Sequence, residues 1–205
     1  MKRYIWLFVL IFSCQKKPEK TTIKPVEEKI SASQISAKIS PEKNIKQLSY
    51  ELINALKSEN YVYFSSKIHP EKGVRFSMYA FINQKRDKVF TKEDFDRYIK
   101  TNILFTWGEK DGSGELYRST LQNYVSDWIM KKDFSKSQML LNKSMATGNS
   151  LNNTKDAYPN AEFVEFYIPG TEKHSKMDWF ALRFVYEKYD GKYFLVGIVN
   201  DQWTI

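Results

Sequence analysis

The sequence predicts an α+β domain in which N-terminal helices pack on a curved, mostly antiparallel sheet that ends in a C-terminal β-meander. Apolar residues recur at helical spacing from Ile45 to Leu56, and three strand-like runs close the chain. Asp190-Gly191 separates the last two runs, and this dipeptide is the strongest short-range signal for a β-hairpin. Helices followed by mostly antiparallel strands are typical of the α+β class.

The first helix is expected to begin at Ser40-Pro41, because serine before a proline at the first helical position is a start signal. Its apolar positions share one face, and they are Ile45, Leu48, Leu52, Ala55 and Leu56. A second, short helix is expected to turn three residues inward, Tyr61, Phe64 and Ile68. Residues 69–73 then turn the chain into a strand over 74–80.

Two further helices are predicted from capping boxes, in which a serine or threonine is followed three residues later by an acid or an amide. Thr91 with Asp94 starts a helix that ends near residue 100. Ser119 with Gln122 starts a helix that ends near residue 131.

The remaining elements are strands and one glycine-rich loop over 108–115. A strand is expected over 103–107 and an edge strand over 138–145. The C-terminal meander is expected to consist of strands over 161–168, 178–189 and 192–203. The middle strand of the meander is largely apolar on both faces, so the sheet is expected to be covered on one side and curved around something on the other.

The first 14 residues read MKRYIWLFVLIFSC, with the positive pair Lys2-Arg3 before an apolar run and Ser13 before the only cysteine, Cys14. A signal peptidase needs a short apolar segment followed by small residues, whereas a spanning helix needs about 20 apolar residues. The stretch resembles a bacterial lipoprotein signal with a lipobox over residues 11–14. The resemblance implies that Cys14 becomes the mature N-terminus and carries a diacylglyceryl thioether. An ordinary cleaved signal or a short anchor is the alternative.

Lipidation implies a lipid-anchored membrane protein of the cell envelope, because several acyl chains give lasting attachment. Its first partner is then membrane lipid, bound through acylated Cys14, and its domain faces the periplasm or the exterior. The residue after the cysteine is Gln15 rather than the Asp that retains many lipoproteins in an inner membrane. We therefore expect an outer-membrane location if the cell has an outer membrane.

The chain divides into a signal peptide over 1–13, a lipidated cysteine with a disordered tether over 14–40, and a single α+β domain over 41–205. Residues 15–44 contain three prolines, many charges and no aromatic residue, so burial cannot offset the entropy of ordering them. A flexible segment of about 30 residues has a typical reach of about 30 Å.

The formal net charge of +8 is concentrated near the expected membrane anchor. Residues 1–14 carry +2, residues 15–44 carry +3 and residues 45–205 carry +3. Each lysine beside anionic lipid adds about 1 kcal/mol of attraction, whereas the nearly balanced domain gives no support for nucleic-acid binding.

Once Cys14 is lipidated no thiol remains, which excludes a disulfide, a cysteine nucleophile and a thiolate metal site.

The order of elements over about 44–205 resembles the nuclear-transport-factor-2-like superfamily, in which helices cap a curved sheet around a pocket. Five phrases also look like an uncharacterised family of bacterial surface lipoproteins: HPEKGVRFS (69–77), TWGEKDGSGE (106–115), YPNAEFVEF (158–166), MDW (177–179) and GKYFLVGIVNDQWTI (191–205). The second resemblance implies a location and domain limits but no activity.

Five residues are candidates for binding a ligand. Arg75, Arg183 and Asp201 are charges on predicted strands with mostly apolar neighbours. Arg183 shares its face with Trp179, and Asp201 shares its face with Trp203. If that face lines a pocket, these groups could bind an anionic or polar ligand. A structural Arg–Asp pair, with the tryptophans in the core, is the alternative.

The glycine-rich loop offers a weak metal candidate, since Asp111 and Glu115 could supply oxygen ligands to calcium. It lacks the acidic spacing of an EF-hand and the ending of a P-loop, so a plain connecting loop is favoured. His69 precedes a proline and His174 lies in a separate charged loop, which is a poor metal signature. We therefore expect no metal and no cofactor, and a surface or turn-stabilising role for His69.

These observations predict a lipid-anchored accessory protein without catalytic residues, which binds a small ligand or an envelope protein through the concave sheet. The alternative is a small hydrolase or isomerase that uses an acid or base in a cone-shaped pocket. The fold class alone cannot decide between them. A strongly shifted carboxylate or histidine pKa inside the pocket would favour the enzyme.

Overall fold

A computed structural model describes residues 41–146 and 151–204, so the predictions for Cys14, the tether and Ser40 lie outside the described residues. The helical segments are α2 (Pro41–Lys57), α3 (Tyr61–Ser65), α4 (Lys92–Tyr98), α5 (Leu121–Tyr124), the π-helix η1 (Val125–Ile129), the 3₁₀-helix η2 (Phe134–Lys136), α6 (Thr154–Ala157) and the 3₁₀-helix η3 (Glu172–His174). Within the described ranges no helix combines the length and the apolar character needed to cross a membrane.

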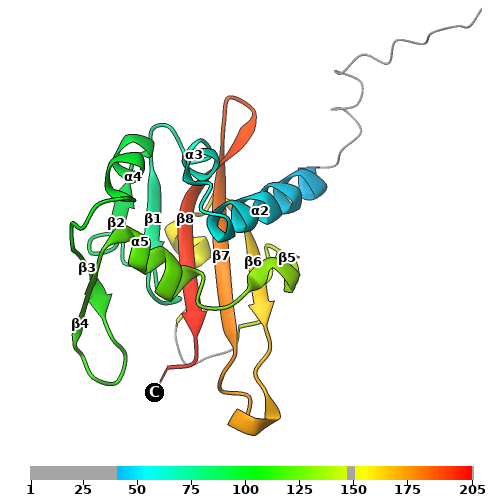
Figure 1. Cartoon of the computed structure of the whole chain (residues 1–205). Helices are drawn as coiled ribbons and strands as arrows, with labels where there is room; N and C mark the ends of the chain where they lie inside the picture. Colours follow the sequence, from blue (N-terminus) through cyan, green and yellow to red (C-terminus); the bar gives the residue numbers. More distant parts are fainter. Residues whose placement is uncertain (1–40, 147–150, 205) are drawn as a thin grey trace, which may run out of the picture. The chain divides into compact units, whose positions relative to one another are not determined.

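The strands confirm the predicted α+β class with a mostly antiparallel sheet (Figure 1). They are β1 (Val74–Ser77), β2 (Lys88–Phe90), β3 (Phe105–Glu109), β4 (Leu116–Ser119), β5 (Gln138–Leu141), β6 (Glu162–Ile168), β7 (Phe180–Tyr189) and β8 (Lys192–Gln202). Six of them form one sheet in the order β2-β1-β8-β7-β6-β5, and β3 pairs with β4 in a separate hairpin. In the six-stranded sheet only β1 and β8 run parallel.

The predicted C-terminal meander is present as β6, β7 and β8. Asp190 and Gly191 form the turn between β7 and β8 with φ values of 48° and 74°. Positive φ at both central residues is the backbone that a tight type I′ hairpin turn requires, which explains the Asp-Gly pair.

Both faces of the sheet are covered. The helices bury one face, where the side chains of Phe166, Leu182, Phe184 and Tyr186 join those of α2 to α5 in the main hydrophobic core. A smaller apolar cluster on the other face consists of Ile82, Phe163, Val185, Val196 and Val199, with Tyr158 and its neighbours packed on it. Figure 1 shows α2, α3 and α5 in front of the sheet and α6 behind it.

One of the two predicted N-caps is correct and the other is wrong by one residue. Thr91 caps α4 by accepting a hydrogen bond from the backbone N–H of Asp94 at 3.1 Å. The second helix is capped by Thr120, which accepts from Asn123 N–H at 3.1 Å, whereas Ser119 is the last residue of β4. The sequence pattern does not predict β4, so the predicted start of the helix falls within this strand.

Two strands are shorter than predicted. β1 ends at Ser77 rather than near residue 80, and β5 ends at Leu141 rather than near residue 145. After β1 the chain leaves the sheet because Asn153 fixes the next loop through reciprocal hydrogen bonds with the backbone of Ile82, at 2.7 and 3.1 Å. The loops that follow β1 and β5 thereby meet over the face of the sheet opposite the helices.

Gly73 and Gly114 provide a matched test of the local packing before β1. Both have positive φ, 67° and 68°, but a Cβ at Gly73 would lie 2.5 Å from the carbonyl oxygen of Phe90, whereas a Cβ at Gly114 meets nothing within 4 Å. Gly114→Ala should lower the free energy of unfolding by about 1–2 kcal/mol through backbone strain alone. Gly73→Ala should cost at least about 1 kcal/mol more because of the clash. Urea unfolding of both variants measures the difference, and equal losses would contradict the close approach.

Candidate functional site

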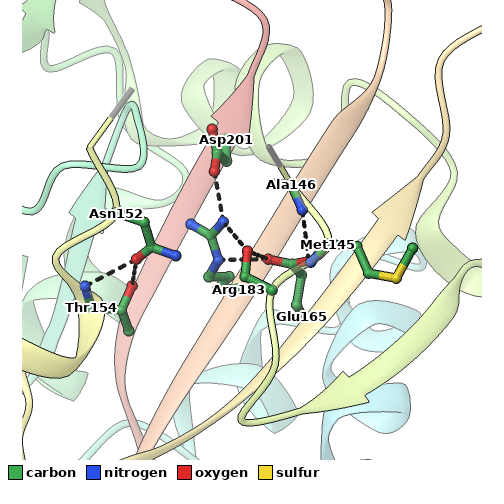
Figure 2. Close-up of polar contacts among 8 residues, drawn as sticks. Met145, Ala146, Asn152, Thr154, Glu165, Arg183 and Asp201 are labelled. Carbon is green, nitrogen blue, oxygen red and sulfur yellow. Dashed lines mark hydrogen bonds and ion pairs between the residues drawn. The ribbon is translucent and has the colours of Figure 1, made fainter. Parts of the chain in front are cut away.

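The structure brings two of the predicted residues, Arg183 and Asp201, together with Glu165 (Figure 2). Arg183 lies on β7, directly opposite Glu165 on β6, and Asp201 lies on β8. The Nε of Arg183 donates to Glu165 Oε2 at 2.7 Å, and its Nη2 donates to Asp201 Oδ2 at 2.6 Å. The Arg183 side chain is 0% exposed, so the cluster is an ion-pair network closed to solvent.

Glu165 is the most highly hydrogen-bonded member of this network. It also accepts from Ser144 Oγ at 2.7 Å and from the backbone N–H groups of Met145 and Ala146 at 2.5 and 3.3 Å (Figure 2). Ser144 Oγ in turn accepts from Arg183 Nη2 at 2.9 Å. These bonds hold the segment after β5 against the sheet.

The electrostatics of the cluster identify it as a structural brace. Two carboxylates share one guanidinium, and burial raises the pKa of Asp201, while Arg183 partly offsets this shift. The Nη1 of Arg183 is buried without a hydrogen-bond partner in the part of the chain that the structure describes. The arrangement matches the structural Arg–Asp pair, which was the alternative to the predicted ligand site.

The other three candidates have different surroundings. Arg75 donates to the hydroxyl of Tyr158 at 3.2 Å and to the carbonyl oxygen of Gln84 at 3.0 Å, so it ties two loops together. Trp179 is buried, whereas Trp203 is 40% exposed. Five hollows on the described part of the chain have none of these five residues in their lining.

The glycine-rich loop is shorter than predicted, because Gly108 and Glu109 belong to β3. The backbone N–H of Asp111 donates to the hydroxyl of Tyr79 at 2.8 Å, and Glu115 lies 3.6 Å from the ammonium of Lys110. Over residues 41–146 and 151–204 no group of three or more histidine, cysteine, aspartate or glutamate side chains is placed to hold a metal ion.

His69 stabilises the turn before β1. Its Nδ1 accepts from the backbone N–H groups of Glu71 and Lys72, both at 3.2 Å. Burial lowers the pKa of His69, and the ring packs edge-on against Tyr189. A neutral imidazole that already accepts two hydrogen bonds fits the turn-stabilising role.

A hollow of about 230 Å³ that the sequence does not predict lies between the loop after β1 and strand β3. We call it the Asp87 hollow, and its main lining residues are Tyr79, Phe81, Asn83, Arg86, Asp87 and Trp107. In the sequence Asp87 stands between Arg86 and Lys88, a pattern typical of a solvated surface. Only the folded chain places aromatic rings beside this carboxylate.

Asp87 and a neighbouring tyrosine are the most perturbed polar groups around the hollow. Asp87 Oδ2 accepts from Ser77 Oγ at 2.5 Å and from Asn83 N–H at 2.9 Å, while burial raises the pKa of the carboxyl. The Tyr124 ring stacks on Trp107 at 3.8 Å, and the Tyr124 hydroxyl is buried without a partner among the described residues. Burial raises the pKa of Tyr124 well above its usual value, and Asp87 raises it further.

Comparisons with known proteins give one remote likeness. No family model matches the chain. No curated protein matches it either. Among solved structures, a calcium/calmodulin dependent protein kinase II association domain from Xanthomonas campestris is similar over 80% of this chain and 88% of its own, with 13% sequence identity and a TM-score of 0.30. The resemblance to the nuclear-transport-factor-2-like superfamily therefore stays a prediction.

Arg183→Met tests the brace. The substitution leaves two buried carboxylates without their cation, so the free energy of unfolding should fall by about 3–5 kcal/mol. Arg86→Met is the matched control, because Arg86 pairs with Glu109 at the surface with 60% of its side chain exposed; its loss should be below about 1 kcal/mol. Adding Glu165→Gln and Asp201→Asn to Arg183→Met should recover part of the loss in urea unfolding. Equal losses in the two single variants would contradict the brace.

Asp87→Asn tests the burial of the Asp87 carboxyl through pH. A raised folded-state pKa means that the folded protein holds this proton more tightly than the unfolded chain, so protonation of Asp87 contributes to the stability of the fold at low pH. This contribution to stability is lost as pH rises from the unfolded pKa of about 3.9 through the higher folded value. The free energy of unfolding of the wild type, relative to Asp87→Asn, should therefore fall over this window. Asp133→Asn should give the opposite slope in a lower pH window: the hydrogen bond from Lys57 and those from Ser135 lower the pKa of Asp133, so its contribution is lost as pH falls below the unfolded pKa of about 3.9. A contribution of Asp133 that falls as pH rises would contradict the assignment.

Proposed function

We propose that this chain is a lipid-anchored accessory protein of the cell envelope that binds a small ligand or an envelope partner without catalysing a reaction. The observation that carries the proposal is the stretch MKRYIWLFVLIFSC, with its positive start, short apolar run and lipobox cysteine. Acylated Cys14 would hold the protein in the membrane, and residues 15–40 would let the domain reach about 30 Å from it. Gln15 supports an outer-membrane location where the cell has one.

The polar groups of the described domain support binding over catalysis. A general acid or base must come within hydrogen-bond reach of its substrate. Glu165 and Asp201 are closed to solvent within the brace, and the Nδ1 of His69 is occupied by two backbone N–H groups. A ligand would therefore contact the surface hollows and not the face of the sheet that holds the brace.

A hydrolase or isomerase is the second candidate, and one observation favours it. Asp87 has a raised pKa and lines a hollow with aromatic walls, a combination that is enriched at catalytic sites. We rank this candidate second because structural hydrogen bonds from Ser77 and Asn83 already occupy Asp87 Oδ2. Burial of the carboxyl accounts for its raised pKa without a catalytic role.

Cys14→Ser tests the anchor in the producing cell. The wild type should incorporate radioactive palmitate and fractionate with membranes, whereas Cys14→Ser should be unlabelled and released from the membrane fraction. Ser13→Ala is the matched control, because alanine is also small and keeps the cysteine in place, so labelling should persist. Continued palmitate labelling of Cys14→Ser would rule out lipidation at this residue.

A further inference from the structure

The Asp87 hollow combines an exposed aromatic ring with a buried aromatic wall. Phe81 at the rim is 50% exposed, whereas Trp107 is 3% exposed and is held by a hydrogen bond from its Nε1 to the carbonyl oxygen of Ser119 at 3.1 Å. Tyr79 is fixed by the bond that its hydroxyl accepts from Asp111 N–H. The hollow therefore offers flat apolar surfaces in fixed positions.

A hydrogen-bond acceptor without a donor lies beside these rings. Both bonds to the Asp87 carboxyl fall on Oδ2, and no described residue donates a hydrogen bond to Oδ1. Asp87 lines the hollow, so Oδ1 can accept a hydrogen bond from a ligand there. Tyr124 stacks on Trp107 and is fully buried, so it supports the wall of the hollow and does not contact the ligand.

The charges around the hollow are largely balanced, which argues against a charged ligand. Arg86 pairs with Glu109 at the rim at 2.7 Å. The positive charges of Arg75 and Arg86 act on Asp87 and partly offset the effect of burial on its pKa. A neutral ligand that both donates and accepts hydrogen bonds therefore suits the site better than an ammonium ion or a carboxylate.

The geometry points to a single sugar ring as the ligand, and we propose that the Asp87 hollow binds a hexose-sized ring, free or at the end of an envelope polysaccharide. A sugar presents an apolar C–H face to aromatic rings and hydroxyl groups to a carboxylate and an amide. The volume of about 230 Å³ lies below the range of about 300–1,000 Å³ that is usual for drug-sized ligands, which limits the site to one ring. A second hollow, of about 300 Å³ near Lys57 and Asp133, is a weaker candidate, because these two residues already pair with each other at 2.8 Å.

The proposal deepens the proposed function by naming the ligand class, and its test does not depend on the anchor. Full-length protein purified from the producing cell, in a detergent without a sugar headgroup, would be titrated with the methyl glycosides of glucose, galactose, mannose and N-acetylglucosamine. Saturation-transfer NMR would report binding, and polysaccharide-coated beads would distinguish a polymer end from a free sugar. At least one glycoside should bind with a Kd of about 1 mM, the affinity expected for so small a ligand.

Two variants locate the binding site. Phe81→Ala removes the exposed ring, Asp87→Asn removes the carboxylate acceptor, and each should weaken binding at least about tenfold. Val62→Ala is the matched control, because Val62 is 81% exposed on α3 and does not line the hollow; its affinity should be unchanged.

Three results would overturn the sugar assignment: no binding of any glycoside, binding unchanged in both hollow variants, or Phe81-dependent binding of tetramethylammonium in place of the sugars. Failure of palmitate labelling with sugar binding intact would overturn the anchor alone.

Discussion

The two carboxylates that share the buried guanidinium of Arg183 set the constraint on which this domain depends. Arg183 joins β6 to β8 through Glu165 and Asp201, and Glu165 also holds the segment after β5. Hydrophobic residues at these positions could pack as well, but breaking the network is costly because it leaves a charge buried. The network therefore specifies one register of three strands and one position of the covering loop.

The local features of the fold could be predicted because short stretches encode them. Thr91 caps its helix through a residue three positions away, and Asp190-Gly191 forms its turn alone. The predictions fail where contacts between distant segments determine the secondary structure. β4 is a strand because β3 pairs with it, and the cap moves to Thr120 because Ser119 is used in that pairing. Local sequence favours both residues as caps, so only the pairing distinguishes them.

The candidate site shows the same division between local and distant information. A charge on an apolar strand indicated that Arg183 and Asp201 were unusual, but not that the segment after β5 covers the cluster through Ser144. Asp87 gave no signal, because the residues around it include Ser77 of β1 and Trp107 of β3, which are distant in the sequence. Which residues share one face of a strand can be read from periodicity, whereas a hollow between a loop and a distant strand depends on tertiary contacts.

The position of β8 has a consequence for how the chain reaches its native state. β8 lies between β1, which precedes it by most of the domain, and β7, its hairpin partner. Because Arg75 and Phe76 pair with Gly197 and Ile198, the two halves of the sheet join only after this late strand has been synthesised. Such non-local pairing slows folding. A polypeptide truncated before β8 would expose two unpaired strand edges, which are sites of aggregation.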